Sequence, residues 1–514
     1  MFSYDCVVVG SGHAGSCAAL SAIEHGCKRV LIVDKCPAEW VGGNGYFTAG
    51  AHRTVHGGLD DLQSVVRGLS PSEATKIDMT PYTAKDFTKD IMTLSKGQSH
   101  PDIVEAVVNG SRDAITWLTD TAGIPFVFSF NRQAYEINGR QRFWGGMVLS
   151  VEDGGKGLIA AHQKALQAAG VETWFNTPAV GLTLENGALS GVQIKKDGNP
   201  VTIQTSAVVL AAGGFESNRK LRAQHLGENW ANVKVRGTPY NTGDGFELAK
   251  SVGAKLVGDW GGCHSTCWDA NAPPDAGDRE LTNQFTKSGY PIGIMVNSRG
   301  ARFVDEGEDF RNYTYAKFGR AILGQPGGFA FQIWDSKVTG YLRNEEYGDE
   351  VVDKVVASSL RGLAVRLSKQ GLEDTETFLS HIGEYNDAVR AFHSEHADLP
   401  WNPAVKDGLS TQSASKSLPC PKTNWALTVD EPPFTAVKVG CGITFTFGGL
   451  AIDAETSAVI AECTNEPIPG IFCTGEMVGG LFYNNYPGGS GLTAGAVFGR
   501  KAGRAAARLC SGEL

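Results

Sequence analysis

Three glycines near the start of the chain have the spacing of an anion-binding turn. Gly10, Gly12 and Gly15 follow the apolar run YDCVVV at residues 4–9 and precede a stretch of small residues. In such a turn the first glycine makes the bend, the second lets the backbone approach a pyrophosphate, and the third lets a helix pack on the strand. The free N–H groups of the helix N-terminus then attract the anion. We expect this turn to hold a dinucleotide through Gly10, Gly12, His13, Ala14 and Gly15.

An acidic residue stands where such a fold binds a ribose. The second apolar run, Arg29 to Val33, ends in Asp34-Lys35, and Asp34 lies 24 residues after Gly10. A carboxylate at this distance can accept hydrogen bonds from ribose hydroxyls. The alternative is a solvated acid that merely ends a strand.

A second glycine-rich turn distinguishes between two dinucleotides. Residues 42–50 read GGNGYFTAG. A nicotinamide enzyme has no obvious need for this turn, whereas FAD must pass a second loop towards its isoalloxazine ring. A hairpin without a ligand is the alternative. The run Val208 to Leu210 leads into Ala211-Ala212-Gly213-Gly214, which is either a second dinucleotide contact or a buried parallel strand with a glycine stop. We therefore expect FAD to be held at these two turns, which include Gly42, Gly43, Ala49, Ala212 and Gly213.

Taken together, these motifs resemble the fumarate reductase/succinate dehydrogenase flavoproteins over nearly the whole chain. Five further stretches continue the resemblance in family order: TGDG at 242–245, HST at 264–266, VNSRGARFVDE at 296–306, PGIFCTGE at 469–476, and residues 479–499. The resemblance implies that further residues line FAD: Lys35, Asn44, Thr48, Gly50, Ala179, Val180, Asp244 and Glu476. It places Ser490, Gly491 and Leu492 at the flavin pyrimidine edge, where a helix N-terminus can stabilise the reduced anion. The flavin-linking histidine of the respiratory members is absent from residues 42–50, so we expect non-covalent FAD.

The same resemblance assigns candidate catalytic residues. Fumarate reductases hold a dicarboxylate with two histidines and an arginine, while a second arginine delivers the proton. His264 falls on the first histidine, and Arg311 falls on the proton donor with an offset of one residue. An arginine needs carboxylates nearby for that role, and Asp305 and Glu306 precede Arg311. The alternative for His264 is a histidine of the core with satisfied hydrogen bonds, and the alternative for Arg311 is an ordinary ion pair.

Two positions depart from the fumarate reductase pattern. Thr444 and Phe445 replace the second histidine, and Tyr486 replaces the carboxylate-binding arginine. A tyrosine cannot provide the bidentate contact of a guanidinium, so simple fumarate reduction is doubtful. The amino-acid sequence of several stretches is similar to that of tricarballylate dehydrogenases, which oxidise a tricarboxylate. The Tyr486-Pro487-Gly488 element is instead similar to 3-ketosteroid Δ1-dehydrogenases, where a tyrosine hydroxyl polarises a ketone. Tyr486 could also be plain packing.

The resemblance predicts an enzyme acting on a small molecule, with oxidation or reduction of a C–C bond next to a carboxylate or carbonyl. Flavin electrons would pass to a quinone, a partner protein or oxygen. The competing hypothesis is an FAD-holding partner subunit whose site has decayed, which the two departures would suggest.

These residues need an α/β framework to position them. The predicted strands come from the start, the middle and the end of the chain, with helix from Ser16 to His25, which indicates a Rossmann-type parallel sheet. The stretch from 260 to 444 carries proline-rich joints, helical segments at 351–369 and 373–392, and no dinucleotide motif. We expect an FAD-binding domain at 1–259 and 445–514 with an inserted α+β capping domain at 260–444.

Composition excludes several classes of function. A net charge of −9 argues against nucleic-acid binding, and no apolar run approaches the roughly 20 residues of a membrane span. The N-terminus has no basic region or cleavage site, so we expect a cytoplasmic protein. Eleven cysteines without a CxxC motif suggest a reduced compartment. Cys263, His264 and Cys267 could supply three metal ligands, but no second cluster completes a tetrahedron, so we expect no metal.

Overall fold

The computed structural model describes residues 2–513, which divide into two compact units. The first comprises Met1–Ala231, Gly237–His264 and Thr444–Leu514, and the second comprises Asn232–Arg236 and Ser265–Ile443. The second unit thus begins at Ser265 where the sequence predicts residue 260. The second unit also contains Asn232–Arg236, which were predicted to belong to the first domain. They belong to the second unit because β14 (Lys234–Val235) pairs in parallel with Gly442 and Ile443.

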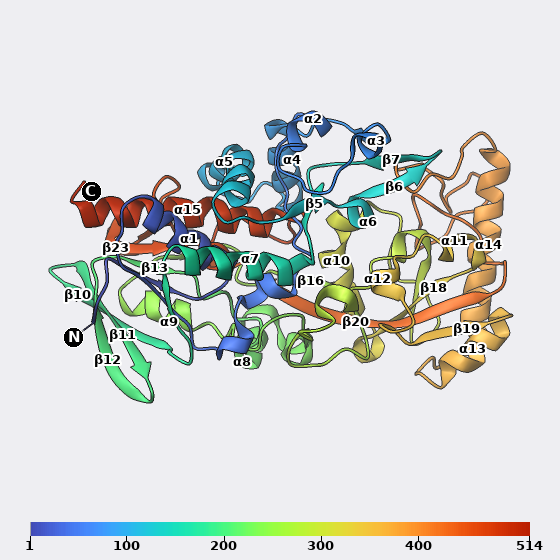
Figure 1. Ribbon diagram of the computed structural model, residues 1–514. Helices are drawn as coiled ribbons and strands as arrows, with labels where there is room; N and C mark the ends of the chain where they lie inside the picture. Colours follow the sequence, from blue (N-terminus) through green and yellow to red (C-terminus); the bar gives the residue numbers. More distant parts are fainter. Residues whose placement is uncertain (1, 514) are drawn as a thin grey trace. The chain divides into compact units, whose positions relative to one another are not determined.

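A six-stranded sheet with the order β22-β23-β13-β2-β3-β9 forms the centre of the first unit (Figure 1). Its strands are β2 (Cys6–Val9), β3 (Val30–Val33), β9 (Glu172–Trp174), β13 (Val208–Leu210), β22 (Ala458–Ile460) and β23 (Pro467–Cys473). All pair in parallel except β22. Val208 of β13 lies opposite both Val7 and Ile471, so the sheet joins the start, the middle and the end of the chain as predicted.

Two helices far apart in the sequence pack closely against each other in this unit. Helix α1 (His13–Glu24) follows β2, and α15 (Ser490–Ser511) lies alongside it (Figure 1). Gly495, Gly499 and Gly503 face α1, and a Cβ at Gly499 would lie 2.8 Å from the Ala14 carbonyl oxygen. The small residues therefore let the two backbones approach closely.

The remaining elements of the first unit surround this sheet. A second sheet has the order β1-β12-β11-β10, made of β1 (Phe2–Ser3), β10 (Ala179–Glu185), β11 (Ala188–Lys196) and β12 (Asn199–Gln204). Helices of this unit include α4 (Ala84–Leu94), α5 (Pro101–Asp120), α7 (Gly154–Ala168), α8 (Arg219–Leu226) and α9 (Asp244–Ser251). Shorter strands are β4 (Ile77–Met79), β5 (Phe126–Phe128), β6 (Ala134–Ile137), β7 (Arg140–Phe143), β8 (Leu149–Val151), β15 (Leu256–Val257) and β21 (Gly449–Leu450).

The second unit is built on a mixed sheet around the long strand β20. The path is β14-β20-β18-β17, and β16 and β19 also pair with β20. The strands are β16 (Cys263–Asp269), β17 (Ile294–Asn297), β18 (Ala330–Trp334), β19 (Lys354–Ala357) and β20 (Phe434–Thr446). Its helices include α10 (Arg311–Leu323), α13 (Leu360–Ser368) and α14 (Thr375–Glu395).

One predicted helix of this unit is wrong in its first half. The sequence predicts a helix over 351–369, but residues 354–357 form β19 and only 360–368 are helical. Ala357 pairs with Phe434 of β20, a partner far away in the sequence. Ser359 then accepts a hydrogen bond from the Gly362 N–H and begins α13.

Within residues 2–513, no helix combines the length and apolar character of a membrane span.

Candidate functional site

The first glycine turn connects β2 to α1 with no room for side chains. Gly10 has φ of 112°, a left-handed conformation that favours glycine, and a Cβ there would collide with the Ala211 carbonyl. A Cβ at Gly15 would collide with the carbonyl of Gly10. Gly12 is the N-cap of α1 in an extended conformation, and it offers no side-chain acceptor to the first N–H groups of the helix. The geometry is that of an open anion-binding helix N-terminus.

Asp34 lies beside this turn. Its Oδ2 accepts hydrogen bonds from the Ser11 N–H at 2.8 Å and the Ser11 hydroxyl at 2.7 Å, and its Oδ1 accepts from the Cys36 N–H at 2.9 Å. The carboxylate therefore braces the glycine turn itself. The next residue, Lys35, donates to Thr242 Oγ1 and to Asp244 Oδ2, which joins the end of β3 to the start of α9. Two of the predicted cofactor residues, Lys35 and Asp244, are thus an ion pair.

Other predicted cofactor residues come near the same edge of the sheet. The Thr177 N–H donates to the Asp34 carbonyl at 2.8 Å, and Ala179 begins β10 two residues later. Val180 is 46% exposed. The predicted nucleotide contacts at the ends of β3 and β10 are therefore close along the backbone.

The second glycine turn is a 3-10 helix at Gly43–Phe47 held by Asn44. The Asn44 side-chain amide donates to Glu216 Oε1 at 2.6 Å and to the Thr444 carbonyl at 2.5 Å. Its oxygen accepts from the Thr238 N–H at 3.0 Å. Thr48 Oγ1 accepts from the Gly50 N–H at 3.0 Å and closes the end of the turn. Asn44 thus ties the loop to three other parts of the first unit.

A pair of carboxyl groups lies at the bottom of this loop. Glu216, fully buried, follows Ala212 and Gly213 and also accepts from Asn241 Nδ2 at 2.6 Å. Glu476 Oε1 accepts from the Thr446 N–H at 2.7 Å, and the ionisation of Glu476 is coupled to that of Glu216. Burial raises the pKa of Glu216 to about 7, and burial and the charge of Glu216 raise the pKa of Glu476 well above its ordinary value. The two groups therefore share a proton near neutral pH.

The sequence analysis missed Glu216. The signal in the sequence was the position of Glu216, two residues after the glycine pair Gly213-Gly214. In the structure, a Cβ at Gly214 would collide with Glu476. Glu476 is only partly buried, so the pair keeps one face for a ligand.

Two of the three predicted catalytic residues meet in the first unit. The rings of His264 and Tyr486 are 4.7 Å apart and nearly perpendicular. Three phenylalanine rings enclose Tyr486: Phe445 at 4.9 Å, Phe482 at 5.3 Å and Phe447 at 6.4 Å. A Cβ at Gly491 would lie 4.0 Å from both Phe445 and Tyr486, which places this aromatic cluster beside the start of α15.

The alternation of strand β20 separates polar and aromatic groups. Thr446 lies with Glu476, whereas its neighbour Phe445 packs on His264 with ring centroids 5.7 Å apart. Successive side chains of a strand point to opposite faces, so one strand end contributes to both environments. The same alternation in β16 turns His264 away from the face of Cys263 and Cys267, which does not favour a three-ligand metal site there.

Arg311 is the first residue of α10, in the second unit. It is half-buried, and its carbonyl accepts a hydrogen bond from the Tyr290 hydroxyl at 3.3 Å. The acids expected to support it have other partners. Glu306 accepts from Arg302 and from the Met295 N–H, and Asp305 accepts from the Thr423 hydroxyl at 2.8 Å.

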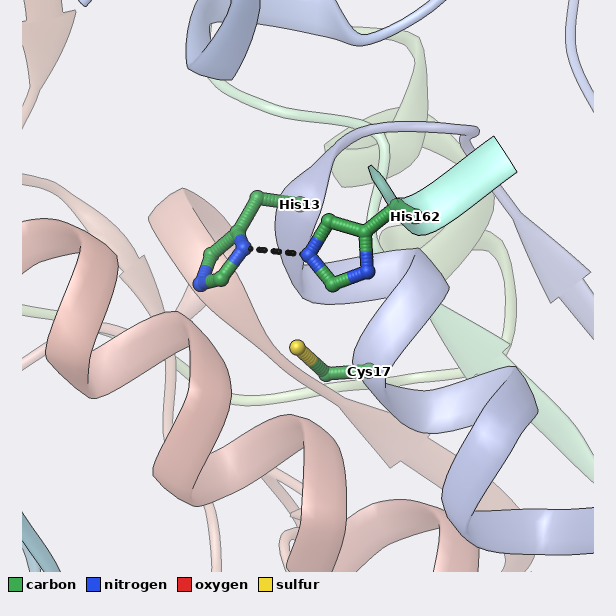
Figure 2. Close-up of side chains that lie close together, drawn as sticks. All are labelled: His13, Cys17 and His162. Carbon is green, nitrogen blue, oxygen red and sulfur yellow. Dashed lines mark hydrogen bonds between the residues drawn. The ribbon is translucent and has the colours of Figure 1, made fainter. Parts of the chain in front are cut away.

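A second group that the sequence did not predict lies behind the glycine turn (Figure 2). His13 Nδ1 and His162 Nε2 of α7 are 2.8 Å apart, and the ligand atoms of His13, Cys17 and His162 all lie within 4.8 Å of one another. His13 Nε2 lies 3.0 Å from the Leu492 carbonyl, which can only accept, so Nε2 carries the hydrogen and Nδ1 accepts from His162. Burial lowers the pKa of His13 to about 4, so the ring is neutral.

The His13 side chain connects three helices of the first unit. The residue lies in the predicted turn, but its imidazole points into the protein and connects α1 to α7 and to the start of α15. It reaches the carbonyl of Leu492, one of the residues predicted at the flavin.

Comparisons with known proteins agree with this geometry. The family model described as "FAD binding domain" matches residues 5–492. The chain is 27% identical to an NADH:fumarate oxidoreductase of Klebsiella pneumoniae over 99% of its own length, and it spans about half (48%) of that protein. It is 26% identical to a vinyl phenol reductase of Lactiplantibacillus plantarum, covering 98% of this chain and 97% of that one. A solved 3-ketosteroid Δ1-dehydrogenase from Sterolibacterium denitrificans has the same fold, with a TM-score of 0.73, 20% identity, and coverage of 99% and 100%.

Proposed function

The chain belongs to the FAD binding domain family, and from that premise we propose that it is an FAD-dependent oxidoreductase that moves two hydrogens across a C–C bond next to a ketone carbonyl. Bound FAD would accept or supply the hydride, and the electrons would go to or come from a partner protein or oxygen. The protein's own contribution is to hold the substrate and to handle charge and protons.

The observation that carries this proposal is the pairing of Tyr486 with His264 inside a set of phenylalanine rings. A dicarboxylate needs fixed cations, whereas a ketone needs only a hydrogen-bond donor and an apolar surface for its carbon skeleton. Tyr486 offers a phenolic hydroxyl among Phe445, Phe447 and Phe482. That chemistry suits a carbonyl on an apolar, unsaturated or cyclic substrate.

In this proposal Tyr486 donates to the carbonyl oxygen and makes the neighbouring C–H more acidic. Charge that develops on the oxygen is stabilised by a donor that is already in place. His264 packs against the edge of Tyr486 and orients its ring. Arg311 is proposed as the proton carrier on the strength of its place in the family motif.

The residues present fit FAD. The open N-terminus of α1 suits a pyrophosphate, and the collisions that a Cβ would cause at Gly10, Gly15 and Gly214 require glycine in the turns expected to contact the cofactor. The carboxyl pair of Glu216 and Glu476 offers acceptors to sugar or ribityl hydroxyls. We propose non-covalent binding, since residues 42–50 contain no histidine. Acid precipitation should then release all of the flavin into the supernatant, and flavin that stays with the precipitate would contradict this.

A carboxylate substrate of the tricarballylate type is the second candidate. It is favoured by the VNSRGARFVDE motif and the arginine that follows it, which in the resembling enzymes acts beside substrate carboxylates.

One experiment separates the two candidates. The flavin is reduced anaerobically by light, and its oxidised absorbance is followed after addition of cyclic or aryl enones, or of fumarate and aconitate. Rapid reoxidation by enones alone supports the ketone proposal. Reoxidation by the acids alone supports the carboxylate candidate. The reverse reaction is tested by adding the saturated compounds to the oxidised flavin. If neither class of compound reacts in either direction, the proposed chemistry is contradicted.

A further inference from the structure

Two cysteines from opposite ends of the chain meet at the surface of the first unit. Cys27 lies in the turn that ends α1, where its N–H donates to the Ala22 carbonyl at 2.9 Å. Cys510 lies in the last turn of α15. The electrostatics of the two side chains are coupled, and neither cysteine is in a disulfide.

Asp5 holds both segments in place. Its carbonyl accepts from the Cys510 thiol at 3.1 Å. Its carboxylate accepts from the N–H groups of Lys28 at 2.7 Å and Arg29 at 2.9 Å, the two residues that follow Cys27. One residue therefore fixes the positions of Cys27 and Cys510 by hydrogen bonds that do not involve the contact between the thiols.

The two thiols differ in the way that a reactive and a resolving cysteine differ. Cys510 is exposed, whereas Cys27 is buried with 5% exposure. The hydrogen bond from Cys27 lowers the pKa of Cys510 to about 7, despite partial burial of its sulfur. The contact with Cys510 and burial both raise the pKa of Cys27. Cys510 is thus the accessible thiol that ionises near neutral pH, and Cys27 is the partner beside it that stays protonated.

We propose that Cys510 and Cys27 form a reversible redox pair that hydrogen peroxide converts to a disulfide. The Cys510 thiolate attacks one peroxide oxygen, the O–O bond breaks, and hydroxide leaves, so that Cys510 becomes a sulfenic acid. Cys27 then loses its proton to hydroxide, and its sulfur attacks the Cys510 sulfur. The S–O bond breaks and an S–S bond forms. The hydroxide that leaves takes up the proton that Cys510 lost on ionisation, so two thiols and one peroxide give one disulfide and two waters.

The disulfide would fasten two helices that already pack closely. Helix α15 lies on α1 through Gly495, Gly499 and Gly503, and its first residues lie near the His13 side chain. A covalent link at the other end of α15 restricts separation of the two helices in the unfolded and partly opened chain. This inference does not depend on the proposed substrate.

The chain offers a matched control. Cys463 is also exposed and outside any disulfide, but it lies between β22 and β23 and not at the end of α1 or of α15. The holoprotein, Cys510→Ser, Cys27→Ser and Cys463→Ser are treated with hydrogen peroxide, alkylated and mapped by mass spectrometry without reduction. Melting temperatures are measured before and after treatment.

We expect a peptide that links residues 27 and 510, with loss of the mass of two hydrogens and full reversal by a thiol reductant. The melting temperature should rise on oxidation in the native protein and in Cys463→Ser but not in Cys510→Ser. A sulfinic acid on Cys510 without a link would overturn the proposal, as would a link from Cys510 to the buried Cys6. An equal rise in melting temperature for Cys510→Ser would also overturn it. If Cys27→Ser folds poorly, the comparison of the native protein with Cys510→Ser still tests the proposal, because residue 510 is exposed and its substitution should not disturb folding.

Discussion

The rings of His264 and Tyr486 form a T-shaped pair with a centroid distance of 4.7 Å and an interplanar angle of 72°. The pair occupies two positions at which the resemblance to fumarate reductases predicts substrate contacts. One position keeps the histidine, and the other replaces a guanidinium with a phenol. This combination retains a place to bind an oxygen atom while it removes the charge that a carboxylate needs.

Removal of the Tyr486 hydroxyl should slow turnover without loss of flavin. Tyr486→Phe keeps the ring among Phe445 and Phe482 but deletes the donor, and loss of such a donor typically costs about 10²–10³-fold in kcat. Flavin content and melting temperature should stay close to those of the native protein. Tyr483→Phe, three residues earlier in the same loop, is the control and should retain full activity. Native rates in Tyr486→Phe would remove the ketone-polarising role.

Arg311→Ala should abolish most of the activity if Arg311 carries the proton. Loss of a positioned proton donor typically costs about 10²–10⁴-fold in rate. Arg320→Ala, on the exposed face of the same helix α10, is the matched control and should change the rate little. If Arg311→Ala is inactive while Tyr486→Phe turns over normally, the carboxylate candidate stands and the ketone proposal falls.

Asp34→Ala should weaken FAD retention. The carboxylate accepts two hydrogen bonds from Ser11 and one from Cys36, so its loss loosens the glycine turn and removes the expected ribose acceptor. Charge-assisted hydrogen bonds of this kind contribute about 1.5–3 kcal/mol, or about 10- to 150-fold in Kd. Ser11→Ala removes only one of these hydrogen bonds and should weaken retention less. Glu476→Ala should also weaken FAD retention, because Glu476 is another residue predicted to line FAD. Full occupancy of both acid variants after dialysis would contradict the placement of the nucleotide.

The carboxyl pair should make the stability of the apoprotein depend on pH. Because the pKa of Glu216 is raised to about 7 in the folded state, the folded chain binds more protons than the unfolded chain between about pH 4.5 and 7. This contribution to stability is present at low pH and is lost as the pH rises through 7. Glu216→Gln mimics the protonated group, so it should match the native protein near pH 5 and exceed it above pH 7. The exposed Glu228→Gln serves as the control in melting experiments across this range, and parallel curves for Glu216→Gln and the native protein would contradict the shared proton.

The parts of the site that the sequence predicts are those determined by local spacing. Gly10, Gly12 and Gly15 specify the turn within six residues, and Asp34 follows directly from the end of the next strand. Glu216 and His162 escaped prediction because their partners, Glu476 and His13, are far away in the sequence and meet them only after the sheet and helices have assembled. For the same reason residues 354–357 were predicted as helix. Their own side chains permit a strand, but it is pairing with β20 that decides it.

The position of β13 between β2 and β23 has a consequence for synthesis on the ribosome. In the sheet that carries the glycine turns, β13 can pair with β2 but lacks its second neighbour, β23, until residues 467–473 have emerged. Helix α1 lacks its packing partner until residues 490–511 follow. The second unit is encoded within residues 232–443 and can therefore complete its core while β2, β3 and β13 still wait for their last strand. Nascent chains stalled before residue 467 should therefore be the forms that most need chaperone protection, because their β13 edge is apolar and unpaired.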